Sequence, residues 1–184
     1  GRCRGRWWRQ ADCRAPEKWH DGVMSTDPFS RLYCLRHFHA ARPLPGQRDF
    51  DRPLDARGQA QAQEIASKII SGAIRFSTVF VSPSVRTMET AARIGIAADD
   101  PRIVISPNLY EAPAEAYFDL LRGGVPDGSL IVGHNPGMEE FIFALCPNAG
   151  RNAELQARGL ATGGFAGIDV PEGQDTFAAG SGQL

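Results

Sequence analysis

The stretch RLYCLRHFHAA, residues 31–41, begins as a short apolar run and ends in arginine and histidine side chains. A short apolar run bounded by polar residues is typical of a strand buried inside a sheet. The pattern predicts a strand over Arg31–Leu35 that delivers Arg36 and His37 to the edge of that sheet. These two residues can belong to a site only if other strands bring matching side chains to the same edge.

The bulk properties of the chain describe a single domain of ordinary size. It has 184 residues, of which 42% are hydrophobic and 22% charged, enough to bury a sizeable core. The formal net charge of −1 gives no overall attraction to nucleic acid or to an anionic membrane surface. No apolar run approaches the ~20 residues that span a bilayer. We therefore expect neither nucleic acid nor a membrane among the partners, and the sequence indicates no oligomeric state.

The cysteines indicate a reducing compartment. The four residues are Cys3, Cys13, Cys34 and Cys146, and they show neither a C-x-x-C spacing nor a zinc pattern. Cys34 falls in the predicted strand and Cys146 at the end of a predicted helix, so we interpret both as small buried hydrophobic residues. Free buried thiols are typical of reducing conditions, and we expect a cytoplasmic protein.

The two ends of the chain differ from the middle in composition. Residues 1–23 hold all three tryptophans together with six basic and three acidic residues, and Met24 resembles a natural start. We expect residues 1–27 to be a disordered or non-native extension; the functional alternative is a basic, aromatic arm that contacts a partner. Residues 171–184 are polar and glycine-rich, so we expect a flexible, truncated tail that lacks a C-terminal edge strand. The predicted domain covers residues 28–170.

Between these ends, short apolar strands alternate with amphipathic helices. The predicted strands cover residues 31–35, 77–81, 102–106, 129–132 and 164–170. The predicted helices cover residues 56–71, 113–121 and 137–145, with a further helix beginning near Pro83. This alternation is typical of a mostly parallel sheet with helices on both faces. The sequence therefore predicts a three-layer α/β/α sandwich, with a long charged loop over residues 36–54 as part of a site.

Polar side chains follow four of the predicted strands, at the edge where parallel α/β sheets bind ligands. They are Arg36, His37 and His39; then Ser82, Ser84 and Arg86; then Glu111; then His134 and Asn135. Two guanidinium groups can hold a phosphate dianion by paired hydrogen bonds. One neutral imidazole can attack phosphorus, a second can donate to its oxygens, and a carboxylic acid can protonate the leaving atom. The set indicates phosphoryl transfer.

Two other interpretations of these residues remain open. A His-x-His pair on an extended segment can chelate, so a metal hydrolase could use His37, His39, His134 and Glu111 as ligands. Against this, two arginines at the same edge would repel a divalent cation and suit an anion. The second interpretation is not an enzyme: it is a regulatory module that binds a phosphorylated ligand without catalysing a reaction.

Three motifs, each after its own predicted strand, resemble the histidine phosphatase (phosphoglycerate mutase-like) superfamily. They are LRHFHA at residues 35–40, SPSVRTMET at 82–90 and VGHNPG at 132–137. The resemblance covers about residues 30–170, and RPL at residues 52–54 with the short length is most similar to the small phosphohistidine phosphatase branch. It implies a phosphoglycerate mutase-like fold and a hydrolase that needs neither a metal nor an organic cofactor.

The resemblance also implies a role for each matching residue. His37 corresponds to the nucleophile that becomes phosphohistidine during the reaction. Arg36 and Arg86 correspond to the arginines that bind phosphate. His134 corresponds to the second histidine, which stabilises the charge of the group being transferred. These four residues, together with Glu111 as the candidate general acid, are the catalytic set that we expect.

Three further residues have a less direct place in the pattern. Glu111 falls where larger family members keep a general acid, which the small branch often lacks. Arg52 is expected to line the mouth of the site and bind substrate. Phe38 replaces the glycine of the usual Arg-His-Gly motif and could narrow the site. The implied activity is removal of a phosphoryl group from phosphohistidine on a protein, with a broad phosphomonoesterase for small metabolites as the alternative.

Overall fold

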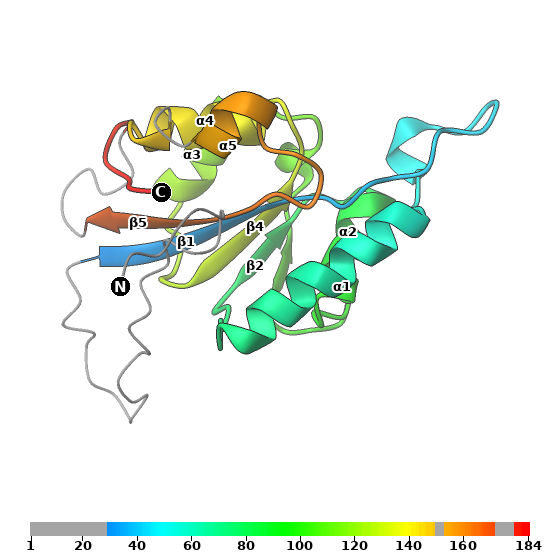
Figure 1. The fold of residues 1–184 in the computed structure, drawn as a ribbon, viewed down its shortest axis with the longest axis horizontal. Coiled ribbons are helices and arrows are strands. Elements are labelled where there is room, and N and C mark those ends of the chain that lie inside the picture. Colours follow the sequence, from blue (N-terminus) through cyan, green and yellow to red (C-terminus); the bar gives the residue numbers. More distant parts are fainter. Residues whose placement is uncertain (1–28, 150–152, 172–178) are drawn as a thin grey trace.

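A five-stranded sheet between two layers of helices forms the centre of the molecule (Figure 1). The structure, a computed structural model, describes residues 29–149, 153–171 and 179–184. The predicted N-terminal extension, residues 1–27, lies outside the described residues, so the expectation about it stays a prediction. The same holds for residues 172–178 of the predicted tail.

The sheet has the strand order β3-β2-β4-β1-β5. Its strands are β1 (Phe29–Arg36), β2 (Val79–Val81), β3 (Ile103–Ile105), β4 (Ser129–Gly133) and β5 (Phe165–Pro171). The pairs β1–β4, β2–β4 and β2–β3 are parallel, whereas β5 runs antiparallel to β1. The mostly parallel sheet that the sequence predicts is therefore confirmed.

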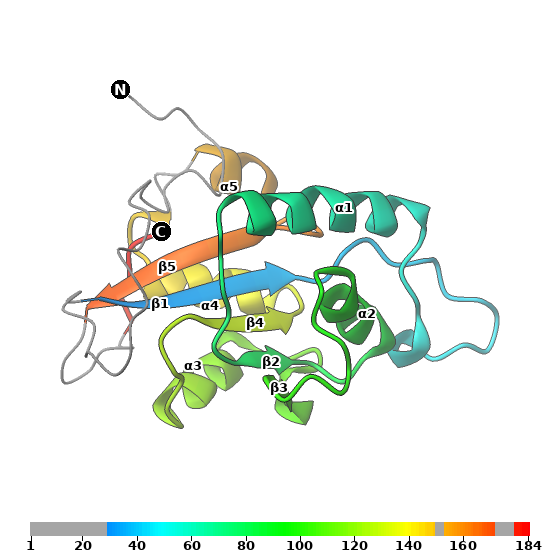
Figure 2. The same cartoon turned by 90° about the horizontal axis from the view of Figure 1, so that it is seen from below.

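Helices cover both faces of this sheet (Figures 1 and 2). One face carries α1 (Ala56–Ser71) and α2 (Val85–Arg93), and the other carries α3 (Ala114–Arg122), α4 (Gly137–Leu145) and α5 (Ala153–Arg158). The bounds of α1 and α4 agree with the sequence prediction. The prediction missed α5, because six residues are too short to show a helical period. None of the described helices is long and apolar enough to cross a membrane.

The strands supply two separate cores, one under each layer of helices. In β1, Leu32 and Cys34 join the core under α3 and α4, whereas Tyr33 and Leu35 join the core under α1 and α2. Successive side chains of a strand point to opposite faces, which is why a strand covered on both sides is apolar throughout. Cys34 and Cys146 are buried free thiols, as the sequence predicts.

The last described residues lie against the sheet. Asp169 of β5 and Gln183 exchange two backbone hydrogen bonds, of 2.9 and 2.8 Å. The backbone N–H of Gly182 donates to the carbonyl of Leu145 at the end of α4, at 2.9 Å. Residues 180–184 are therefore held against the domain.

Phe38, the residue that departs from the family motif, lies in the core and not in the site. Its side chain is fully buried in the core under α1 and α2, and its backbone N–H donates to Oγ1 of Thr90 at 3.1 Å. The aromatic ring thus fills space between the end of β1 and the helices. The expected narrowing of the site does not follow from this position.

The burial of Phe38 predicts a measurable contribution to stability. Replacing a buried phenylalanine by alanine removes apolar contacts and leaves a cavity, at a cost of about 3–5 kcal/mol. We expect Phe38→Ala to lower the free energy of unfolding by that amount in urea denaturation. The control is Ile70→Ala, since Ile70 is 78% exposed on α1 and its loss should change stability by about 0.5 kcal/mol or less. Equal effects of the two substitutions would contradict the assignment of Phe38 to the core.

Candidate active site

The register between β1 and β4 sets two histidines side by side. Arg36 pairs with Gly133, so His37 and His134 follow as neighbours at the carboxyl ends of two parallel strands. The backbone N–H of His37 donates to the carbonyl of Gly133 at 3.1 Å, and the two imidazole centroids are 5.2 Å apart. Two motifs that are almost a hundred residues apart in sequence therefore meet at one edge of the sheet.

Tyr117 of α3 holds the end of β4 in place. Its buried hydroxyl accepts a hydrogen bond from the backbone N–H of His134 and donates to the carbonyl of the same residue, both at 3.1 Å. A Cβ at Gly133 would lie 2.5 Å from this hydroxyl oxygen, so a glycine is required at that point of the motif. The backbone that carries His134 is thus fixed from both sides.

The ring of His37 has a defined tautomer and stays neutral. Its Nδ1 lies 2.7 Å from the carbonyl oxygen of Phe38, which can only accept, so Nδ1 carries the ring proton. Nε2 is left with a free lone pair, and no described residue forms a hydrogen bond to it. Burial, followed by the nearby charges of Arg86, Arg36 and Arg52, lowers the pKa of His37 to about 4. The ring is therefore neutral near pH 7, and its Nε2 lone pair is available.

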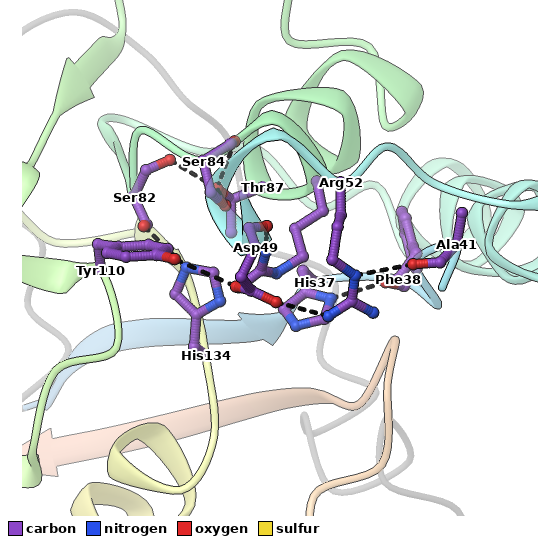
Figure 3. Close-up of polar contacts among 11 residues, drawn as sticks. His37, Phe38, Ala41, Asp49, Arg52, Ser82, Ser84, Thr87, Tyr110 and His134 are labelled. Atoms are coloured by element: carbon purple, nitrogen blue, oxygen red, sulfur yellow. Dashed lines mark hydrogen bonds and ion pairs between the residues drawn. The ribbon is translucent and has the colours of Figure 1, made fainter. Parts of the chain in front are cut away.

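Ser82, at the end of β2, binds the ring of His134. Val81 pairs with Val132, and the next residue places its Oγ 2.8 Å from Nε2 of His134 (Figure 3). The buried hydroxyl has no other partner among the described residues, so donation to Nε2 is the arrangement that satisfies it. The ring proton of His134 is then on Nδ1. Burial, and then the proximity of His37 and Arg86, lowers the pKa of His134 to about 3.

Hydrogen-bond donors without a partner mark this edge of the sheet. Within the described residues, three buried side-chain atoms lack a hydrogen bond: Nε of Arg36, Nδ1 of His134 and Oδ1 of Asn135. Arg36 is fixed by donation from Nη1 to the carbonyl of Leu160 at 2.6 Å, which leaves its Nε free. An unpaired buried donor is costly, and two of them beside the free lone pair of His37 indicate a missing acceptor.

A second group of charges lies next to the histidines. The short 3₁₀ helix η1 (Asp49–Asp51) brings Asp49 to Arg86, whose Nη1 and Nη2 donate to the carbonyl and to Oδ2 of Asp49, both at 2.7 Å. Arg52 Nη1 donates to Oδ1 at 2.6 Å, and the hydroxyl of Tyr110 donates to Oδ2 at 3.1 Å (Figure 3). Burial alone would raise the pKa of Asp49, but the hydrogen bonds from Arg52 and Arg86 lower it to about 2. Asp49 is therefore ionised.

Comparison with known proteins identifies the family. The family described as histidine phosphatase superfamily (branch 1) matches residues 32–120. A crystal structure of the "putative phosphohistidine phosphatase SixA" of Agrobacterium tumefaciens is 34% identical and has a TM-score of 0.69. The match covers 77% of this chain and 92% of that chain. The chain belongs to the histidine phosphatase superfamily. The phosphoglycerate mutase-like fold class that the motifs predict is confirmed by this likeness.

Two curated proteins are also similar to this histidine phosphatase chain, and both are named only as uncharacterized. One, from Picosynechococcus, is 27% identical over 138 residues, which are 70% of this chain and 81% of the relative. The other, a chloroplastic protein of Arabidopsis thaliana, is 30% identical over 133 residues, 66% of this chain and 61% of the plant protein. The name of neither relative includes a substrate.

The structure brings five of the six predicted site residues to the same edge, namely His37, His134, Arg36, Arg86 and Arg52. Glu111 is the exception, because its side chain is exposed and makes no hydrogen bond or ion pair with the part of the chain that the structure describes. Its backbone has a φ of 48°, in the left-handed region that side chains other than glycine rarely adopt. The roles of all six residues stay predictions.

The metal-site interpretation finds no matching arrangement. His39 Nδ1 lies 2.7 Å from Oδ2 of Asp55, whose other oxygen accepts from the N–H of Gly58 and caps α1. Across residues 29–149, 153–171 and 179–184 there is no group of three histidine, cysteine, aspartate or glutamate side chains that could hold a metal ion. His37, His39, His134 and Glu111 therefore do not converge.

Sequence reasoning missed two residues that contact the cluster, Asp49 and Tyr110. Asp49 stands three residues before Arg52, a spacing that one helical turn converts into a contact, and this was the available signal. Tyr110 follows a predicted strand, directly before Glu111, and that position was the available signal. The carbonyl of Leu160, which fixes Arg36, gave no signal because a backbone acceptor has no residue type.

The lowered pKa of His37 predicts how its protonation responds to pH. In the folded protein the ring stays neutral down to about pH 4, whereas in the unfolded chain it takes up a proton near its ordinary value of 6.5. The unfolded state then binds more protons between these values, so the contribution of His37 to the free energy of unfolding falls as the pH drops from 6.5 to 4. Imidazole ¹⁵N shifts, assigned with the His37→Asn variant, measure this directly. A titration of His37 near pH 6.5 would contradict its burial.

Proposed function

We propose that this protein removes a phosphoryl group from phosphohistidine on a protein through a phospho-His37 intermediate. The observation that carries the proposal is the pair of buried donors without acceptors, Arg36 Nε and His134 Nδ1, beside the free Nε2 of His37. Fixed donors placed around a nucleophile suit the negative oxygens of a phosphoryl group in transfer. With Arg86 and Arg52, the cluster has three guanidinium groups, and Asp49 is the one carboxylate among the described residues that is bonded to them.

The proposed reaction has two steps with balanced bonds. The Nε2 lone pair of His37 attacks phosphorus while the bond between phosphorus and the leaving nitrogen breaks, and the leaving imidazole keeps that electron pair. Arg36, Arg86 and His134 bind the three phosphoryl oxygens, and the Phe38 carbonyl stabilises the positive ring through Nδ1. Water then attacks phosphorus, and the bond between phosphorus and Nε2 breaks. Inorganic phosphate departs, and the His37 ring is neutral again.

The substrate class follows from what the leaving group requires. Glu111 is exposed and makes no hydrogen bond or ion pair with the described residues of the cluster. Hydrogen bonds from Arg52 and Arg86 keep the pKa of Asp49 at about 2, so Asp49 is ionised, and the cluster does not hold Glu111 as a general acid. An alcohol leaving from a phosphomonoester needs such a proton donor. The second ring nitrogen of phosphohistidine can take a proton from water near neutral pH, since imidazole has a pKa of about 6.5. The site therefore favours phosphohistidine, in agreement with the name of the neighbour from Agrobacterium.

Substitution of the nucleophile tests the mechanism. We expect His37→Asn to lower the rate of phosphoramidate hydrolysis by roughly 10³-fold or more, because the covalent step is lost. The wild-type protein, quenched during turnover, should carry a phosphoryl group that is labile in acid and stable in base. The control is His39→Asn, two residues along the same segment, which should retain most of the activity. Full activity of His37→Asn would contradict the mechanism, and loss of wild-type activity in EDTA with recovery in zinc would favour a metal hydrolase.

A comparison of substrates tests the proposed class. We expect kcat/KM for a phosphohistidine-carrying protein to exceed that for small phosphomonoesters by about 100-fold or more, the usual contribution of a missing general acid. Phosphate release from both kinds of substrate, measured with one enzyme preparation, gives this ratio. Similar values would favour a broad phosphomonoesterase, and no release from either substrate would favour a phosphate-binding regulatory module.

A further inference from the structure

We infer that the Asp49 carboxylate is an internal occupant of the phosphoryl-binding site, which a substrate must displace from Arg86 before it can react. The inference rests on the function proposed above and goes beyond it, because it assigns a gating role to a residue outside the predicted catalytic set. It concerns how tightly the site binds phosphoryl groups and how readily it releases the phosphate product.

Asp49 presents to the site the same chemistry that a phosphoryl group would present. Three of its oxygens, two from the carboxylate and one from the backbone carbonyl, accept four hydrogen bonds of 2.6–3.1 Å from side chains. The donors are the guanidinium groups of Arg86 and Arg52 and the hydroxyl of Tyr110. A phosphoryl group likewise offers three oxygens, and arginine forks are well matched to both anions.

The ion pair leaves Arg86 with little room for a second anion. The Arg86 side chain is only 5% exposed, and both of its terminal nitrogens are bonded to Asp49. Yet Arg86 lies beside the histidines, because its guanidinium carbon is 5.9 Å from the centroid of the Tyr110 ring, which is itself 5.6 Å from that of His134. Its charge also contributes to the lowered pKa of both His37 and His134. A carboxylate and a phosphoryl dianion on the same guanidinium would repel each other strongly in a partly dry site. Binding of one therefore requires departure of the other.

The position of Asp49 in the chain allows such an exchange. Its side chain is 41% exposed, and it lies in a loop whose base is closed by the hydrogen bond from Ala41 N–H to the Pro53 carbonyl, at 2.9 Å. Figure 1 shows this loop projecting from the layers of the domain, and Leu44 within it is 69% exposed. η1 is a single turn, and it meets the rest of the site through the hydrogen bonds of Asp49 and through the contact between the Phe50 and Tyr110 rings, whose centroids are 5.1 Å apart.

Exchange with an internal anion has a clear consequence for affinity. Only molecules in which Asp49 has left Arg86 can bind a phosphoryl group. The apparent affinity is therefore the intrinsic affinity multiplied by the fraction of such molecules. Anions that bind arginine less strongly than a phosphoryl group would not displace the carboxylate. The same competition assists release of inorganic phosphate after the second step. Asp49 thus favours turnover over retention of product.

Calorimetric titration with inorganic phosphate tests this inference. Asp49→Asn keeps the shape of the side chain and removes its charge, and we expect it to bind phosphate about tenfold more tightly than the wild type. Asp49→Ala, which removes both side-chain oxygens that accept hydrogen bonds, should tighten phosphate binding likewise. The matched control is Asp51→Asn in the same turn, because Asp51 pairs only with the exposed Arg48 through its side chain and should leave the affinity unchanged. Product inhibition by phosphate should strengthen in parallel in the two Asp49 variants.

The outcomes separate this inference from the proposed function. If the wild type binds phosphate and both Asp49 variants bind it equally or more weakly, the carboxylate serves to orient Arg86 and the gating role is overturned. If neither the wild type nor the Asp49 variants bind phosphate, the proposed function itself fails. Arg86→Gln, which should abolish binding in the wild-type background, establishes that the titrated phosphate occupies this site.

Discussion

The parallel pairing of Arg36 with Gly133 is the constraint on which the rest of the site depends. It is set by packing on both faces of β1, where Leu32 and Cys34 belong to one core and Tyr33 and Leu35 to the other. A slip of one residue would exchange these side chains between cores of different shape, so hydrophobic burial far from the chemistry fixes the register. The two histidines meet because the strands that precede them have only one good alignment.

The residues that could be predicted from sequence are those whose position follows from a strand end. His37 and His134 come directly after buried apolar runs, and the parallel topology alone brings them together. Asp49 could not be predicted in this way, since its contact with Arg86 depends on the path of an irregular loop with no hydrophobic period. The orientation of Glu111 depends on a single backbone torsion, and a left-handed glutamate has no sequence signal. Local patterns therefore predicted the sheet edge but not the loop contacts around it.

The electrostatics of the site connect binding with activation of the nucleophile. The guanidinium groups that would hold a phosphoryl group also lower the pKa of His37, after the larger effect of burial. The Phe38 carbonyl fixes the proton on Nδ1, so the free lone pair is on Nε2 without help from a general base. When Nε2 forms a bond to phosphorus, the ring becomes positive beside those arginines, and the negative phosphoryl oxygens compensate it. The positive charges of the arginines thus favour both the neutral form of His37 and the binding of an anionic ligand.

The two halves of the site, Arg36 with His134 and Arg86 with Arg52, differ in how their hydrogen-bond donors are satisfied before a ligand binds. Arg36 and His134 are fixed by the sheet and hold buried donors without acceptors, a state that is unfavourable until an anion arrives. Arg86 and Arg52, by contrast, already share the carboxylate of Asp49 as a hydrogen-bond acceptor. Arrival of a phosphoryl group therefore adds hydrogen bonds in the rigid half and only exchanges them in the loop half. Most of the net gain must come from Arg36 and His134, the two residues held next to the nucleophile by the register of β1 and β4.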